Sequence, residues 1–137
     1  MNNHIYFIYF IYYSDIYISK LNSAGSYLWG RRIGGGSGDF AFSFEMDSDQ
    51  KLFIGGTFEG TVDFNPGTGF SSLSSSGDRD GFILKLDADA NFLWARNIGG
   101  SGDDEIRGVS TQTPDIVYVG GFFENTVDLD PSTGVTN

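Results

Sequence analysis

The sequence predicts an all-β fold built from several short antiparallel strands. Glycine supplies 20 of the 137 residues, and aromatic side chains make up 16% of the chain, a combination that suits short strands joined by tight turns. Phe82, Leu84 and Leu86 share one face of their segment, and Phe92, Trp94 and Ile98 share one face of theirs, which indicates strands. No segment shows a sustained apolar period of 3.6 residues, so we expect no helix.

Composition and charge exclude several classes of function. The chain has no cysteine, which excludes disulfide scaffolds, thiol nucleophiles and Cys-ligated metal sites. Its one histidine, His4, has no neighbouring partner for a catalytic triad or a His-rich metal site. The net charge of −10 argues against binding to nucleic acid or to an anionic membrane surface. We therefore expect no nucleic-acid partner.

The N-terminal segment differs from the rest of the chain. Ile5 to Tyr13 is an unbroken run of Ile, Tyr and Phe, which is too short for a membrane span. No Lys or Arg precedes the run and no small-residue cleavage site follows it, so no signal peptide is visible. We expect residues 1–14 to lie outside the domain, with an additional β-strand as the alternative, and residues 15–137 to form a repeat region.

The chain contains an internal repeat with a period of about 65 residues. The matched segments are Asp15–Leu21 with Asp80–Leu86, Tyr27–Arg31 with Phe92–Arg96, Ile33–Gly35 with Ile98–Gly100, Ile54–Glu59 with Val119–Glu124, and Thr61–Pro66 with Thr126–Pro131. One extra glycine in the first copy would bring Ser37–Asp39 onto Ser101–Asp103. So many ordered matches exclude a chance similarity.

Each repeat is predicted to contain four strands, the number in one blade of a β-propeller. The expected strands are residues 42–49 and 105–112, 52–59 and 116–124, 16–22 and 81–87, and 26–33 and 91–98. Hairpin turns are expected at Ala24–Ser26 and Asp89–Asn91, and a long surface connection from Ser71 to Asp80. We therefore predict four-stranded antiparallel blades of β-propeller type, with about two repeats in an incomplete ring. The half blades are residues 15–38 and 101–137, and the full blade is residues 39–100.

The repeat motifs resemble those of a known family. They are the segments Asp80–Asp87, Asn91–Arg96 and Gly99–Asp104, together with the loop Val62–Gly67. These are similar to the SBBP-type β-propeller repeats of bacterial surface and secreted proteins. The resemblance implies an exported protein, extracellular or at the cell surface of a bacterium, and it says little about activity.

Two acidic loops are candidates for binding Ca²⁺. Asp63 and Asn65 stand before one proline, and Asp128 and Asp130 before another; oxygen side chains two residues apart suit this cation. The alternative, which we favour, is an Asx turn stiffened by proline. The segment Asp87–Asn91 resembles the start of an EF-hand loop but lacks its later Gly and Glu, so we expect a turn. No cofactor is required, and Ca²⁺ is the one that the sequence suggests.

Two Trp–Arg pairs are candidates for a ligand surface. Trp29 lies two residues before Arg31, and Trp94 two residues before Arg96. A guanidinium stacked on an indole ring could form part of a sugar-binding surface. Their recurrence at the same position of the repeat favours packing between blades instead, with each Arg reaching the next turn.

From the sequence we expect a non-enzymatic scaffold whose loops bind a protein or a glycan. One alternative is a fragment of a propeller lyase or hydrolase, with its carboxylates among Asp78, Asp104, Glu105 and Asp115. Another is a truncated gene product with no independent function. The two half blades are complementary, so self-association through them is also expected as a hypothesis.

Overall fold

The structure is a computed structural model that describes residues 13–132, and this part of the chain contains strands, turns and loops but no helix. The strands are β1 (Ile16–Leu21), β2 (Tyr27–Gly35), β3 (Phe40–Met46), β4 (Leu52–Phe58), β5 (Thr61–Asp63), β6 (Ser72–Ser74), β7 (Asp80–Leu86), β8 (Phe92–Gly100), β9 (Glu105–Thr113), β10 (Ile116–Phe122) and β11 (Val127–Asp128). The prediction of an all-β fold is therefore confirmed. His4 and most of the apolar segment 1–14 lie outside the described residues. A helix long and apolar enough to cross a membrane is likewise absent from residues 13–132.

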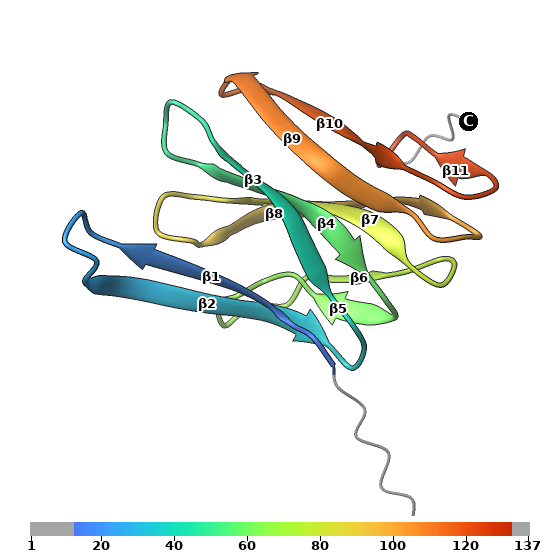
Figure 1. The fold of residues 1–137 in the computed structure, drawn as a ribbon, viewed down its shortest axis with the longest axis horizontal. Helices are drawn as coiled ribbons and strands as arrows, with labels where there is room; N and C mark the ends of the chain where they lie inside the picture. The colour runs from blue at the N-terminus through green and yellow to red at the C-terminus, as the bar shows by residue number, and fades with distance from the viewer. Residues whose placement is uncertain (1–12, 133–137) are drawn as a thin grey trace, which may run out of the picture.

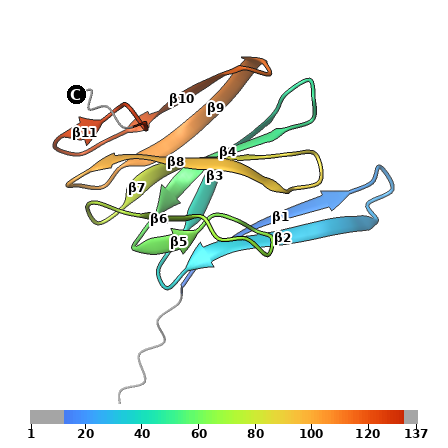
Figure 2. The same cartoon turned by 180° about the vertical axis from the view of Figure 1, so that it is seen from behind.

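The strands form three antiparallel sheets. The central sheet has the order β8-β7-β4-β3, and β11 pairs with the end of β8. The β1–β2 hairpin is extended by β5 and β6, and β9 and β10 form a hairpin of their own. Both views of the ribbon place the central sheet between the β1–β2 hairpin and the β9–β10 hairpin (Figures 1 and 2).

The eight long strands lie where the sequence predicts them, whereas three short strands were not predicted. The connection from Ser71 to Asp80 is more ordered than a surface loop, because it contains β6. This strand pairs with β5, which in turn pairs with Gly34 and Gly35 at the end of β2. The pairing thus joins each repeat to the one before it, as the β11–β8 pair does further along.

The two middle strands of the central sheet, β4 and β7, are buried on both faces. Alternate side chains of β7, namely Phe82, Leu84 and Leu86, belong to a core cluster that includes Ile16 and Ile33 of the β1–β2 hairpin. On the opposite face, Ile83 packs with Phe53 and with Ile106 of β9. Burial at successive positions of β4 and β7 follows from this position between two layers.

Two buried aspartates show that the repeat keeps a constant offset of 65 residues. The carboxylate of Asp39 accepts the N–H of Gly35 at 2.9 Å, and that of Asp104 accepts the N–H of Gly100 at 2.6 Å. Both side chains are 1% exposed. Asp39 therefore corresponds to Asp104, and the alignment with Asp103 through an extra glycine is wrong. The Ser-Gly-Asp identity that suggested it is local and has no structural counterpart.

Three hairpin turns share one hydrogen-bonding pattern. In each, a side-chain oxygen accepts the backbone N–H groups two and four residues later, and the residue between those two has a positive φ. The accepting residues are Asn22, Asp47 and Asp87, and the left-handed residues are Gly25, Gln50 and Ala90. These are Asx turns, and the turn predicted over Asp87–Asn91 is confirmed. The Asn91 amide also bonds Asp87 and holds the pKa of its carboxyl below the ordinary value.

Candidate interaction surface

The first acidic loop follows β5 and is built from two successive Asx turns. Asp63 Oδ1 accepts the N–H of Asn65 at 3.0 Å and that of Ser71 at 2.8 Å. Asn65 Oδ1 accepts the N–H of Gly67 at 2.9 Å. Both candidate ligands therefore shape the loop itself, as the favoured alternative predicts.

The second acidic loop follows β11 and repeats this pattern. Asp128 Oδ1 accepts the N–H of Asp130 at 3.0 Å, and Asp130 Oδ1 accepts the N–H of Ser132 at 2.9 Å. The Ser132 hydroxyl and N–H hold the pKa of the Asp130 carboxyl below its ordinary value. In the described part of the chain, no group of three or more His, Cys, Asp or Glu side chains is placed to hold a metal ion.

A polar pocket opens beside the second loop, with a volume of about 170 Å³. It brings side chains of two successive repeats together, and its polar lining consists of Ser76, Asn97, Asp128, Asp130 and Ser132. The sequence pattern marks the two aspartates but not Ser76 or Asn97. The sequence signal for Asn97 was that Arg32 stands at the matching position, whereas Ser76 has no counterpart within the repeat region 15–137.

Asn97 differs from its counterpart in a way that changes the site. Its amide donates to Asp80 Oδ2 at 3.0 Å. In the preceding repeat, Arg32 forms an ion pair with the matching aspartate, Asp15. The same carboxylate position is thus held by a short neutral side chain in one repeat and by a long cation in the other. The shorter partner lines the polar pocket.

The two tryptophans lie in the packing between sheets. Trp29 is half-buried against the first core cluster, and Trp94 packs edge-to-face on Phe53 with ring centroids 6.2 Å apart. Arg31 lies 5.5 Å from the Trp29 ring and donates to the backbone carbonyl of Asp89, in a turn of the central sheet. Arg96 lies 6.0 Å from the Trp94 ring and donates to the carbonyl of Ala95. The first pair makes the contact between sheets that the packing alternative predicts.

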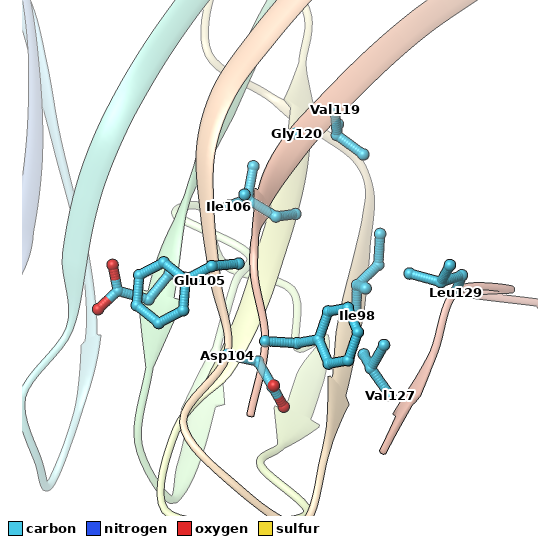
Figure 3. A pocket seen from close by; sticks show the side chains of 11 residues that line it. Ile98, Asp104, Glu105, Ile106, Val119, Gly120, Val127 and Leu129 are labelled. Atoms are coloured by element: carbon cyan, nitrogen blue, oxygen red, sulfur yellow. The ribbon is translucent and has the colours of Figure 1, made fainter. Parts of the chain in front are cut away.

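Two apolar hollows flank the open strand edges, and the sequence analysis identified neither. One, of about 190 Å³, lies between β8, β10 and β11, where Ile98, Val127 and Leu129 point toward one another (Figure 3). The other, of about 420 Å³, lies between β1 and β3 and includes Tyr17 and Phe44. Each lining combines residues of several strands, so no local motif marks them.

The carboxylates considered for a catalytic role have other surroundings. Asp104 is buried and accepts N–H groups of Gly100 and Glu124. Glu105 forms an ion pair with Arg107. Burial raises the pKa of Asp39, the counterpart of Asp104, although the N–H groups of Gly35 and Glu59 oppose the shift. These interactions give both buried aspartates a structural task in the turn.

Comparison with known proteins gives a distant similarity. No known protein-family model matches the chain. The regulatory protein FlaEY of Caulobacter vibrioides is 27% identical over 125 residues, an alignment that covers 88% of this chain and 13% of FlaEY. The chain therefore spans a small part of the length of this relative.

Proposed function

We propose that the chain is a non-enzymatic repeat segment of β-propeller type that acts as a binding scaffold. Support comes from the 65-residue offset, the four-stranded sheet β8-β7-β4-β3, and the hairpins that repeat half of this sheet on either side. In this proposal the central sheet is one blade and each hairpin is half of another. The similarity to part of a much longer bacterial protein agrees with a module of a larger assembly.

The observation that carries the binding function is the polar pocket between the two repeats. Its framework residues recur, as Asp15 and Asp80 do, whereas its lining residue Asn97 is replaced by Arg32 in the preceding repeat. A ligand site that varies on a constant framework is typical of scaffold folds. The hydroxyl, amide and carboxylate groups present both donors and acceptors, which suits the hydroxyl groups of a glycan; polar groups of a protein are the alternative ligand.

The variant Asn97→Arg tests this proposal with a residue that the chain itself uses at the matching position. Arg32 shows that arginine can pair with the aspartate there, so we expect the variant to fold. Its longer side chain fills the pocket. We expect the unmodified chain to bind one class of glycan on an array, and Asn97→Arg to weaken that binding about tenfold or more, the loss of one or two hydrogen bonds.

The matched control is Asn91→Ala, which removes an amide in the turn at the other end of β8 and leaves the pocket lining unchanged. Equal binding by Asn97→Arg and the unmodified chain would contradict the proposed pocket. Absence of binding to every glycan on the array would contradict a glycan ligand, and pull-down with exported bacterial proteins would then test the protein alternative.

Stiffening of the acidic loops by Ca²⁺ stays a prediction of the sequence. It is tested by adding 1–5 mM CaCl₂ at about physiological ionic strength, with MgCl₂ as the control, and following the melting temperature. A rise with Ca²⁺ alone that is lost in Asp130→Ala would support it. Placement at a bacterial surface or outside the cell is likewise proposed from the family resemblance, and a regulatory role, from the name of the similar protein, is the second candidate.

A further inference from the structure

We propose that the β1 edge of one copy pairs with the β10 edge of a second copy, so that two hairpins complete a four-stranded sheet. Among the strands that the structure describes, β1 pairs only with β2, and β10 only with β9. The mixed order β9-β10-β1-β2 repeats the observed order β3-β4-β7-β8. This self-association is independent of the proposed glycan binding, so either proposal can fail without the other.

The central sheet supplies the register of the mixed pair. Its β4–β7 pairing, moved by 65 residues, joins Val117 with Leu21, Tyr118 with Lys20, Val119 with Ser19, Gly120 with Ile18, and Gly121 with Tyr17. In the central sheet, the glycine opposite Phe82 leaves room for its ring, because a Cβ at Gly56 would lie 2.8 Å from it. Gly121 would leave the same room for Tyr17.

The apolar hollow beside β10 is where the Tyr17 ring of the second copy would lie. Phe82, the counterpart of Tyr17, is fully buried and its ring packs 4.8 Å from that of Phe64 and 6.4 Å from that of Phe58. The counterparts of those two rings are Leu129 and Phe123, and both line the hollow. Tyr17 itself is 82% exposed. One copy thus presents the exposed Tyr17 ring, and another presents a hollow at the position that corresponds to the packing site of the Phe82 ring.

The larger groove between β1 and β3 fits the second copy's β9–β10 hairpin. In the central sheet, a Cβ at Gly55 would meet Ile106 at 2.6 Å and Val109 at 2.7 Å, whereas its counterpart Gly120 has open space. The counterparts of Ile106 and Val109 are Ala41 and Phe44, which line the groove. One position departs from this pattern, because Phe122 replaces Thr57, whose hydroxyl donates within reach of two backbone carbonyls. Phe122 has no hydroxyl to make this contact in the mixed sheet.

The contact joins different surfaces of the two copies, so it propagates until it closes a ring. Residues 13–132 of each copy contain eight long strands, enough for two four-stranded sheets. Propellers have four to eight blades, so we expect a ring of about two to four copies, with a mass two to four times 15.0 kDa.

Cross-linking tests the register. The chain has no cysteine, so the single variants Lys20→Cys and Tyr118→Cys can be mixed and oxidised with no contribution from native thiols, and each variant oxidised alone measures pairing between like copies. Their counterparts Lys85 and Phe53 lie on one face, with the ammonium 4.6 Å from the ring centre. We expect a disulfide-linked pair from this mixture, and much less from Lys20→Cys with Val119→Cys, whose side chain faces the other way. Equal yields, or none, would overturn the proposed pairing.

Light scattering on a sizing column tests the assembly and the role of the Tyr17 ring. We expect Tyr17→Asp to weaken association at least about 30-fold, as loss of a central interface residue does, and to remain folded by circular dichroism. The control Phe70→Asp alters a residue that is 80% exposed in a loop outside both hollows; it should associate normally. A monomer at tens of micromolar would overturn the inference and favour neighbouring repeats of a longer chain as the occupants of both edges. Specific cross-linking within a polydisperse species would overturn the closed ring.

Discussion

The strands β4 and β10 have nearly the same sequence pattern and opposite surroundings. Residues 52–58 read LFIGGTF and residues 117–123 read VYVGGFF, yet every side chain of β4 is buried and most of β10 is exposed. β4 has β3 and β7 as neighbours and a packed layer on each face, whereas β10 pairs with β9 alone in the described chain. Burial in this protein is therefore decided by neighbours, not by the strand's own residues.

The largest predicted effect contrasts Phe58→Ala with Phe123→Ala. Phe58 is fully buried between two other aromatic rings, so its removal should lower the free energy of unfolding by about 3–5 kcal/mol. Phe123 is 54% exposed, and its removal should cost less than about 1 kcal/mol in dilute solution. Urea unfolding at low micromolar concentration measures both. Similar losses of unfolding free energy in the two variants would show that β10 is covered even in the monomer. That result would contradict the difference in surroundings between β4 and β10.

The next effect comes from the paired glycine variants Gly55→Ala and Gly120→Ala. The methyl group at position 55 would press on Ile106 and Val109 and should cost about 1–3 kcal/mol. The same group at position 120 meets nothing within 4 Å, so stability of the monomer should change by less than about 0.5 kcal/mol. If Gly120→Ala lowers stability only at concentrations where copies associate, the result would support both the difference between β4 and β10 and the proposed mixed sheet.

Much of this fold could be predicted from the sequence because each repeat motif occurs twice in the chain. The alternation in β7 and β8 and the repeated motifs located all eight long strands. The short strands β5, β6 and β11 were missed because their pairs are two or three residues long and depend on strands of the preceding repeat.

The candidate site was less predictable than the fold. The acidic loops were identified, and so was their alternative as Asx turns, since Asp and Asn before proline carry that local signal. Asn97 and Ser76 carry no such signal, because a polar residue that differs between repeats resembles any surface position. The equivalence of Asp39 and Asp104 was also missed, because a three-residue identity outweighed the constant spacing.

A smaller effect is expected from the hairpin turns of the two regions. Asp87→Ala removes an acceptor of two backbone N–H groups in the central sheet and should lower global stability by about 1 kcal/mol. Asn22→Ala removes the same bonds at the tip of the β1–β2 hairpin. There we expect faster amide hydrogen exchange in β1 and β2 with little change in the unfolding midpoint. Loss of global stability in both would indicate that the outer hairpin unfolds together with the sheet.

The smallest effect is the pH dependence contributed by Asp39. Burial raises its pKa above the ordinary value of 3.8, so the folded state holds this proton to a higher pH than the unfolded state does. Stability attributable to Asp39 therefore falls as the pH rises from the unfolded pKa through the raised folded pKa. Asp39→Asn cannot titrate, so the stability of the unmodified chain relative to this variant should be greater at pH 3.5 than at pH 6. Urea unfolding of both at the two pH values measures it, and an opposite trend would contradict the raised pKa.

The backward pairing of β5 with β2, and of β11 with β8, has a consequence for dividing the chain. A boundary drawn at the end of the first predicted half blade, near Gly38, would separate β2 from the strand that caps its last two residues. A segment that keeps these pairs must extend beyond Ser74. Because the end of each unit is paired with a strand of the unit that follows it, loss of one unit exposes the end of the unit before it.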